Sequence, residues 1–181
     1  MHSSYLTALQ LNNLHNLSSL WEACRRYETQ AAQVFGVPSD AVPAYAALSP
    51  EEVMGLALQL DVSVVVPRLS AAELAAFPPC MVVGLSMFDR SSVQNLNVLN
   101  LQALRDACRQ SQGEAAWAYH IDAAEAQAYA ALSDDMLLAA STRLEVFAFA
   151  PRYGRQELAT LSGEPAALAG LFSAVFEQAV H

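Results

Sequence analysis

Ala44-Tyr45-Ala46-Ala47-Leu48-Ser49 occurs a second time, letter for letter, as Ala128-Tyr129-Ala130-Ala131-Leu132-Ser133. The offset of 84 residues (128 − 44) holds without a gap on both sides, and roughly a third of positions 13–75 match their partners. The matching residues before the hexapeptide include Asn13/Asn97, Asn16/Asn100, Leu17/Leu101, Leu20/Leu104 and Cys24/Cys108. Ungapped identity of this extent is far above chance, so the sequence indicates a tandem duplication.

The size of the two copies limits how they can be organised. The chain has 181 residues, and each copy alone is at the size where a single hydrophobic core is marginal. Two copies are too few for a solenoid, which leaves two small similar domains or one domain with pseudo-two-fold symmetry. The copies span 1–88 and 89–181, and no low-complexity linker separates them. We therefore favour two copies packed intimately into one unit.

Most of each copy has a helical pattern. Residues 5–35 are predicted to form one long helix, because apolar and small residues recur at steps of three and four without an intervening Pro or Gly. Such a stripe suits close helix–helix packing. The predicted contact between the repeats therefore consists of Leu17, Leu20, Cys24, Leu101, Leu104 and Cys108.

Turn and capping residues predict where the other helices begin and end. Gly36 with Pro38 should end the first helix sharply, whereas the counterpart at 120–122 lacks both signals and should end less sharply. Ser49, Ser70 and Ser133 are placed as N-caps. The further helices are expected at 50–60, 134–144, from 71 onward, at 80–88 and at 165–179.

The hydrophobic period changes to two at 61–66 and 145–150, which are rich in β-branched and aromatic residues and are followed by Pro-Arg. Each copy thus offers one strand, and a lone strand needs a partner. We predict that the two strands pair antiparallel and that the long helices pack across the same axis. The expected fold is mainly α, with two helical repeats forming a pseudo-two-fold dimer in one chain.

Composition limits the classes of partner. The net charge is −9 and all nine basic residues are arginine, so the chain lacks the basic surface of an autonomous nucleic-acid binder. No apolar run approaches the roughly 20 residues that span a bilayer, and the N-terminus has no signal-peptide pattern. A cytoplasmic protein without membrane contact is expected.

The sequence contains no recognisable catalytic constellation. There is no phosphate-binding Gly-rich loop, and the acidic pairs at 51–52 and 134–135 fit helix N-termini better than acid–base chemistry. Cys24 and Cys108 have no visible base, so buried thiols are favoured over nucleophiles, with a disulfide across the axis as the lesser alternative. We expect neither an enzyme nor a bound cofactor or metal.

Several polar residues are ambiguous from sequence alone. Tyr45 and Tyr129 are interpreted as buried plugs whose hydroxyls reach backbone carbonyls, rather than as partner anchors. The asparagines at 13, 16, 97 and 100 are interpreted as capping a helix or fixing helix register at a buried seam, with a functional role as the lesser alternative. The candidates for nucleic-acid or partner contact, with solvated charge as the alternative, are Arg68, Arg90, Arg152 and Arg155.

The sequence resembles the FlhD family, which supplies a subunit of the flagellar master transcriptional activator. The resemblance covers residues 1 to about 88 and extends weakly through the repeat. It rests on Met1-His2-Ser3-Ser4-Tyr5-Leu6, Asn16-Leu17-Ser18-Ser19-Leu20, Phe35, Ala46-Ala47-Leu48-Ser49-Pro50 and a strand ending at Arg68.

The resemblance implies a mostly helical, intertwined dimer fold that acts with a DNA-binding FlhC-like subunit on flagellar or related promoters, so that DNA is contacted through the complex. Two features depart from the family: 62–66 lacks its subunit-linking cysteine, and no basic residue follows Arg155. The missing basic tail favours the alternative, an adaptor of a motility or secretion system that does not bind DNA. Further self-association of the chain stays open.

Overall fold

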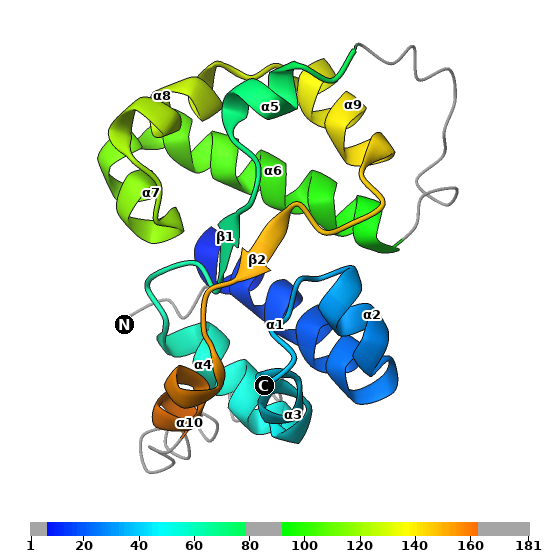
Figure 1. Cartoon of the computed structure of the whole chain (residues 1–181). Coiled ribbons are helices and arrows are strands. Elements are labelled where there is room, and N and C mark those ends of the chain that lie inside the picture. The colour runs from blue at the N-terminus through cyan, green and yellow to red at the C-terminus, as the bar shows by residue number, and fades with distance from the viewer. Residues whose placement is uncertain (1–6, 79–91, 163–181) are drawn as a thin grey trace, which may run out of the picture.

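A computed structural model describes residues 7–78 and 92–162, and these residues are mainly helical with one two-stranded antiparallel sheet (Figure 1). The first half contains α1 (Ala8–Arg26), α2 (Glu28–Gln33), α3 (Val42–Ala47), α4 (Pro50–Gln59), β1 (Val65–Pro67) and α5 (Ala71–Ala75). The second half contains α6 (Ser92–Gln110), α7 (Gln112–Tyr119), α8 (Ala123–Ala131), α9 (Asp134–Arg143), β2 (Phe149–Pro151) and α10 (Arg155–Ser162). The bounds of α6, α9 and β2 are those of α1, α4 and β1 moved by 84 residues.

The last described helix of each half, α5 or α10, packs on the other half. In Figure 1, α5 lies with α6 to α9, α10 lies with α1 to α4, and the two strands cross between the groups. The contacts agree, because α5 touches α8 and α9 while α10 touches α3 and α4. The buried apolar residues of both halves form one cluster.

The predicted long helix over 5–35 is wrong in its extent. α1 ends at Arg26, and Tyr27 has φ −144° and ψ 65°, which interrupts the helix before α2 begins. Tyr27 is exposed, whereas Ala31 and Val37 beyond it are buried. The bend returns the chain to the core, which a straight helix would leave. A break at Ser111 separates α6 from α7 at the equivalent place.

The end of α7 also differs from expectation. Gly36 has φ 68°, as a left-handed turn residue should, but His120 adopts φ 56° at the equivalent position. The His120 N–H donates to carbonyls of the last turn, and Ile121 N donates to Ala116 O at 3.0 Å. These bonds and the packing of Ile121 against the core hold a conformation that is uncommon for residues other than glycine.

The predicted N-caps are confirmed. Ser49 and Ser70 each accept a bond from the backbone N–H of the glutamate three residues on, and that glutamate accepts from the cap's own N–H. Ser133 accepts from Met136 N at 3.2 Å. These caps fix the starts of α4, α5 and α9 where the sequence placed them.

The antiparallel strand pair is confirmed, but each strand is shorter than predicted. The register pairs Val65 with Pro151, Val66 with Ala150 and Pro67 with Phe149. The segments before each strand bond to an asparagine side chain of a helix. Within the described residues no helix is both long and apolar enough to cross a bilayer.

Candidate functional site between the two halves

A buried asparagine pair joins the two long helices. Asn16 Nδ2 donates to Asn100 Oδ1 at 2.7 Å, and Asn100 Nδ2 donates to Asn16 Oδ1 at 2.8 Å. Both side chains are fully buried. We call this contact the asparagine seam. The predicted buried seam is confirmed for Asn16 and Asn100, and a buried amide pair of this kind is satisfied in one register of the two helices.

A second asparagine in each helix holds a strand. Asn13 donates to Val62 O at 2.9 Å and accepts from Val64 N at 3.0 Å. In the other half, Asn97 donates to Val146 O at 2.9 Å and accepts from Ala148 N at 2.7 Å. Each amide thus offers the strand the donor and acceptor that a neighbouring strand would, which explains why β1 and β2 begin late.

The repeated tyrosines tie each half to the segment that crosses from the other. Tyr45 in α3 donates its hydroxyl to Tyr153 O at 2.9 Å, and Tyr129 in α8 donates to Leu69 O. Both rings are fully buried, and burial is the main cause of their raised pKa values. The interpretation as buried plugs bonded to carbonyls is confirmed, and the structure adds that the carbonyls belong to the crossing segments.

Backbone bonds between the halves repeat at the same offset. Arg68 N donates to Ala148 O and Arg152 N to Val64 O, both at 2.9 Å. Ser63 N likewise donates to Ala118 O, as Phe147 N does to Val34 O, again at 2.9 Å. Each partner differs from its counterpart by 84 residues (152 − 68, 148 − 64, 147 − 63 and 118 − 34).

The six predicted repeat-interface residues are all buried in the common cluster: Leu17, Leu20, Cys24, Leu101, Leu104 and Cys108. Both thiols are free. Burial, followed by the nearby Glu28, raises the pKa of Cys24 to about 11. Burial and Glu125 raise the pKa of Cys108 to about 11. At neutral pH both remain protonated, which suits a packing role and not nucleophilic chemistry.

The candidate arginines lie in different surroundings. Arg152 donates to Ala118 O at 2.9 Å, at the carboxyl end of α7, and is half-buried. Arg68 is exposed and its guanidinium lies against Gly36. Arg155 is exposed in the first turn of α10, and Arg90 lies outside the described residues.

Outside the described residues lie the helices predicted at 80–88 and 165–179 and the boundary predicted between residues 88 and 89.

The two sides of the asparagine seam are filled differently. On one side the rings of Phe35 and Phe147 lie 5.5 Å apart, and Phe149 continues the cluster at 5.6 Å. The residues 84 positions away are Tyr119 and Ser63 (35 + 84 and 147 − 84). Tyr119 shares a hydrogen bond with Asn12, and burial raises the pKa of its hydroxyl to about 12. We call these the aromatic side and the open side.

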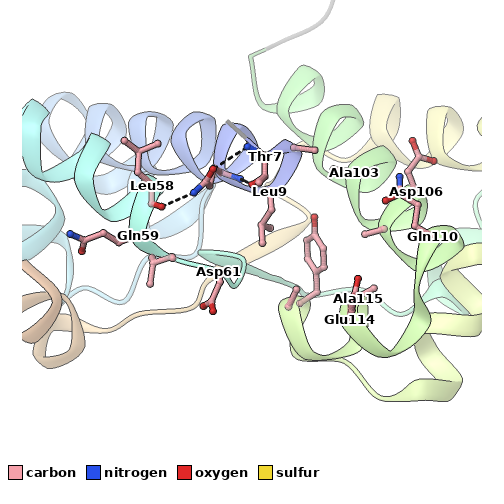
Figure 2. Close-up of a pocket in the computed structure, with 16 residues that line it drawn as sticks. Thr7, Leu9, Leu58, Gln59, Asp61, Ala103, Asp106, Gln110, Glu114 and Ala115 are labelled. Atoms are coloured by element: carbon pink, nitrogen blue, oxygen red, sulfur yellow. Dashed lines mark hydrogen bonds between the residues drawn. The ribbon is translucent and has the colours of Figure 1, made fainter. Parts of the chain in front are cut away.

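A cavity of about 660 Å³ lies on the open side, between α1 and α4 of one half and α6 and α7 of the other (Figure 2). One wall is held by hydrogen bonds, since Gln10 caps α1 with Thr7 and donates to Leu58 O at 2.7 Å. The lining combines aliphatic side chains with three carboxylates, those of Asp61, Asp106 and Glu114.

Sequence reasoning missed this cavity. A signal was present, because the two copies differ at several cavity-lining positions: Gln110, Ala118 and Tyr119 stand where the first copy has Arg26, Val34 and Phe35. The smaller side chain and the lost cation follow from the alignment of the copies. The alignment does not show that these positions line one cavity.

Comparison with protein-family models, with curated proteins and with solved structures gives no match to this chain.

Proposed function

We propose that this chain is a fused pseudo-dimer of FlhD type, formed by tandem duplication, and that it serves as a non-enzymatic subunit of a transcriptional regulator. The supporting observation is that the asparagine, tyrosine and backbone bonds between the halves recur at the 84-residue offset of the sequence repeat. Isologous contacts of this kind are what a two-fold interface produces. The exchange of α5 and α10 corresponds to the intertwining that the family resemblance implies.

The charge of the chain supports a role within a complex. Among the arginines that the structure describes, Arg105, Arg109 and Arg152 are engaged internally, and Arg26 pairs with Glu22 at 3.0 Å. Against a net charge of −9, the free cations are too few for tight phosphate binding. The FlhC-like partner would therefore supply most of the DNA contact at flagellar or related promoters.

The test is a gel shift with a flagellar promoter fragment, using this chain, an FlhC-like protein of the same cell, and both together. We expect no shift from the chain alone and a specific shift from the co-purified pair. Arg155→Ala should weaken assembly or DNA binding several-fold, while Arg143→Ala, another exposed arginine, should not. Failure of the two proteins to co-purify would reject the proposal.

The alternative is a motility or secretion adaptor that does not bind DNA. It is favoured by the internal bonding of Arg152 and by the absence of basic residues after Arg155. Pull-downs that recover secretion or signalling proteins, and no transcription factor, would select this function.

A further inference from the structure

The cavity on the open side has the size of a ligand site and no part in the proposed regulatory function. Its volume of about 660 Å³ falls within the range of small-molecule pockets, roughly 300–1,000 Å³. Both halves line it, so its shape depends on how they pack together. Its aliphatic surface comes from Leu9, Leu58, Leu60, Ala103, Ala107 and Ala115.

The charged side chains that line the cavity are all acidic. No lysine, arginine or histidine lines it. Asp106 pairs with Arg105 Nε at 3.1 Å, from outside the lining. Among residues 7–78 and 92–162, Asp61 and Glu114 have no ion-pair partner. Figure 2 shows Asp61, which follows α4, and Glu114, in α7, on opposite sides of the space.

The position of Asp61 and Glu114 on opposite sides of the cavity discriminates between kinds of cation. A metal ion needs several ligands within its coordination shell, and no group of three or more metal-binding side chains occurs in the part of the chain described. Separated carboxylates with aliphatic surface between them match a ligand whose positive charges are separated by methylene groups. We propose that the cavity binds a linear aliphatic diamine or polyamine, with ammonium groups at Asp61 and Glu114 and the methylene chain against Leu9 and Leu60.

The first copy shows which substitutions in the second copy would close the cavity. At the position of Gln110 it has Arg26, whose guanidinium pairs with Glu22, and at the position of Ala118 it has the larger Val34. An arginine at position 110 would place a cation at the cavity, and a valine at 118 would reduce its volume. Each grafted residue is already accommodated at the equivalent place in the first copy, so these variants test binding with little risk to folding.

The experiment is calorimetric titration of the full chain with spermidine and with 1,6-diaminohexane, at an ionic strength of about 0.15 M to screen diffuse attraction. We expect saturable binding at one site and about tenfold weaker binding of 1-aminohexane, which has lost one charge-assisted hydrogen bond. Asp61→Asn and Glu114→Gln should each weaken diamine binding about tenfold, and Gln110→Arg should abolish it.

The matched control is Glu145→Gln, because Glu145 is exposed and stands 84 residues after Asp61. It should leave binding unchanged. Absence of saturable binding by the folded wild-type chain would overturn the proposal. Equal weakening by Glu145→Gln and Asp61→Asn would also overturn it, because binding would then follow the net charge of the chain. Circular dichroism confirms folding of each variant. Binding is measured on the isolated chain, so the result is independent of the regulatory function.

Discussion

The aromatic side and the open side of the asparagine seam are built from positions 84 residues apart, yet one is filled and the other is hollow. Phe147 is fully buried and contacts Phe35 on the aromatic side. On the open side the corresponding positions hold Ser63 and Tyr119, next to a cavity. In a homodimer every substitution appears on both sides of the axis. In a single chain the sides vary independently, so one can stabilise the fold while the other forms a site.

The carbonyls at the ends of α3 and α8 are also bonded by different residues in the two halves. In the first half, Trp21 Nε1 donates to Leu48 O at 2.7 Å. In the second half the position of Trp21 holds Arg105, and Arg109 Nη2 donates to the equivalent carbonyl, Leu132 O, at 2.9 Å. The carbonyl keeps a donor in both halves while the donor residue changes. Both halves therefore supply a hydrogen-bond donor to this carbonyl, and a different residue provides it in each half.

Removal of the central ring of the aromatic side should have the largest effect. We expect Phe147→Ala to lower the free energy of unfolding by about 3–5 kcal/mol, because it loses a large buried ring and leaves a cavity. Urea unfolding measures this. Val146→Ala, at a side chain that is 41% exposed, is the matched control and should stay within about 0.5 kcal/mol. Equal effects would mean that the aromatic side is not a packed core.

Substitutions in the asparagine seam should have the second-largest effect on the free energy of unfolding. Asn100→Ala removes partners from Asn16 and Asn12 and should cost about 2–3 kcal/mol, because buried amides lose their hydrogen bonds. Asn16→Ala should cost less, since Asn100 keeps its bond to Leu96 O. The double variant, measured by the same unfolding assay, should be less destabilised than the sum of the single variants. Strict additivity would show that the two amides do not interact.

A smaller effect should distinguish Arg109 from Arg25, its counterpart in the first half. Arg109 bonds two carbonyls, those of Ala130 and Leu132, each at 2.9 Å, whereas Arg25 stacks 4.8 Å from the centre of the Trp21 ring. We expect Arg109→Ala to cost about 1 kcal/mol and Arg25→Ala about 0.5 kcal/mol or less at this exposed site. Thermal unfolding compares them, and the reverse order would contradict the assignment of donors.

The smallest effect concerns pH. The hydrogen bond from Arg105, with its charge, lowers the pKa of Asp134 below its ordinary value, and the first half has Trp21 and Pro50 at these positions. A lowered folded-state pKa stabilises the protein above the unfolded-state value of about 3.9, and this contribution is lost as the pH falls toward the folded-state value. Asp134→Asn should therefore reduce stability at pH 6 and have little effect at pH 2.5. Equal effects at both pH values would contradict an ionic contribution.

Local chemistry made much of the fold predictable. Serine caps with glutamate three residues on mark the starts of α4 and α5, and a serine followed by an acidic first turn marks the start of α9. Runs of β-branched and aromatic residues followed by Pro-Arg mark the strands, so these helices and the strand pair could be placed from sequence. The turn at His120 could not, because its left-handed conformation is imposed by bonds to the preceding helix and by the core.

The sequence by itself determined the mainly helical class, the burial of Tyr45 and Tyr129 and the recurrence of residues at an offset of 84. Hydrophobic period, capping and repetition can all be read from the order of residues along the chain. Tertiary structure alone decided that α5 packs on the second half and α10 on the first. It also decided that Tyr45 bonds a carbonyl 108 residues away and that Asp61 and Glu114 line one cavity. These features join residues distant in the chain, and packing of the whole core selects which of them meet.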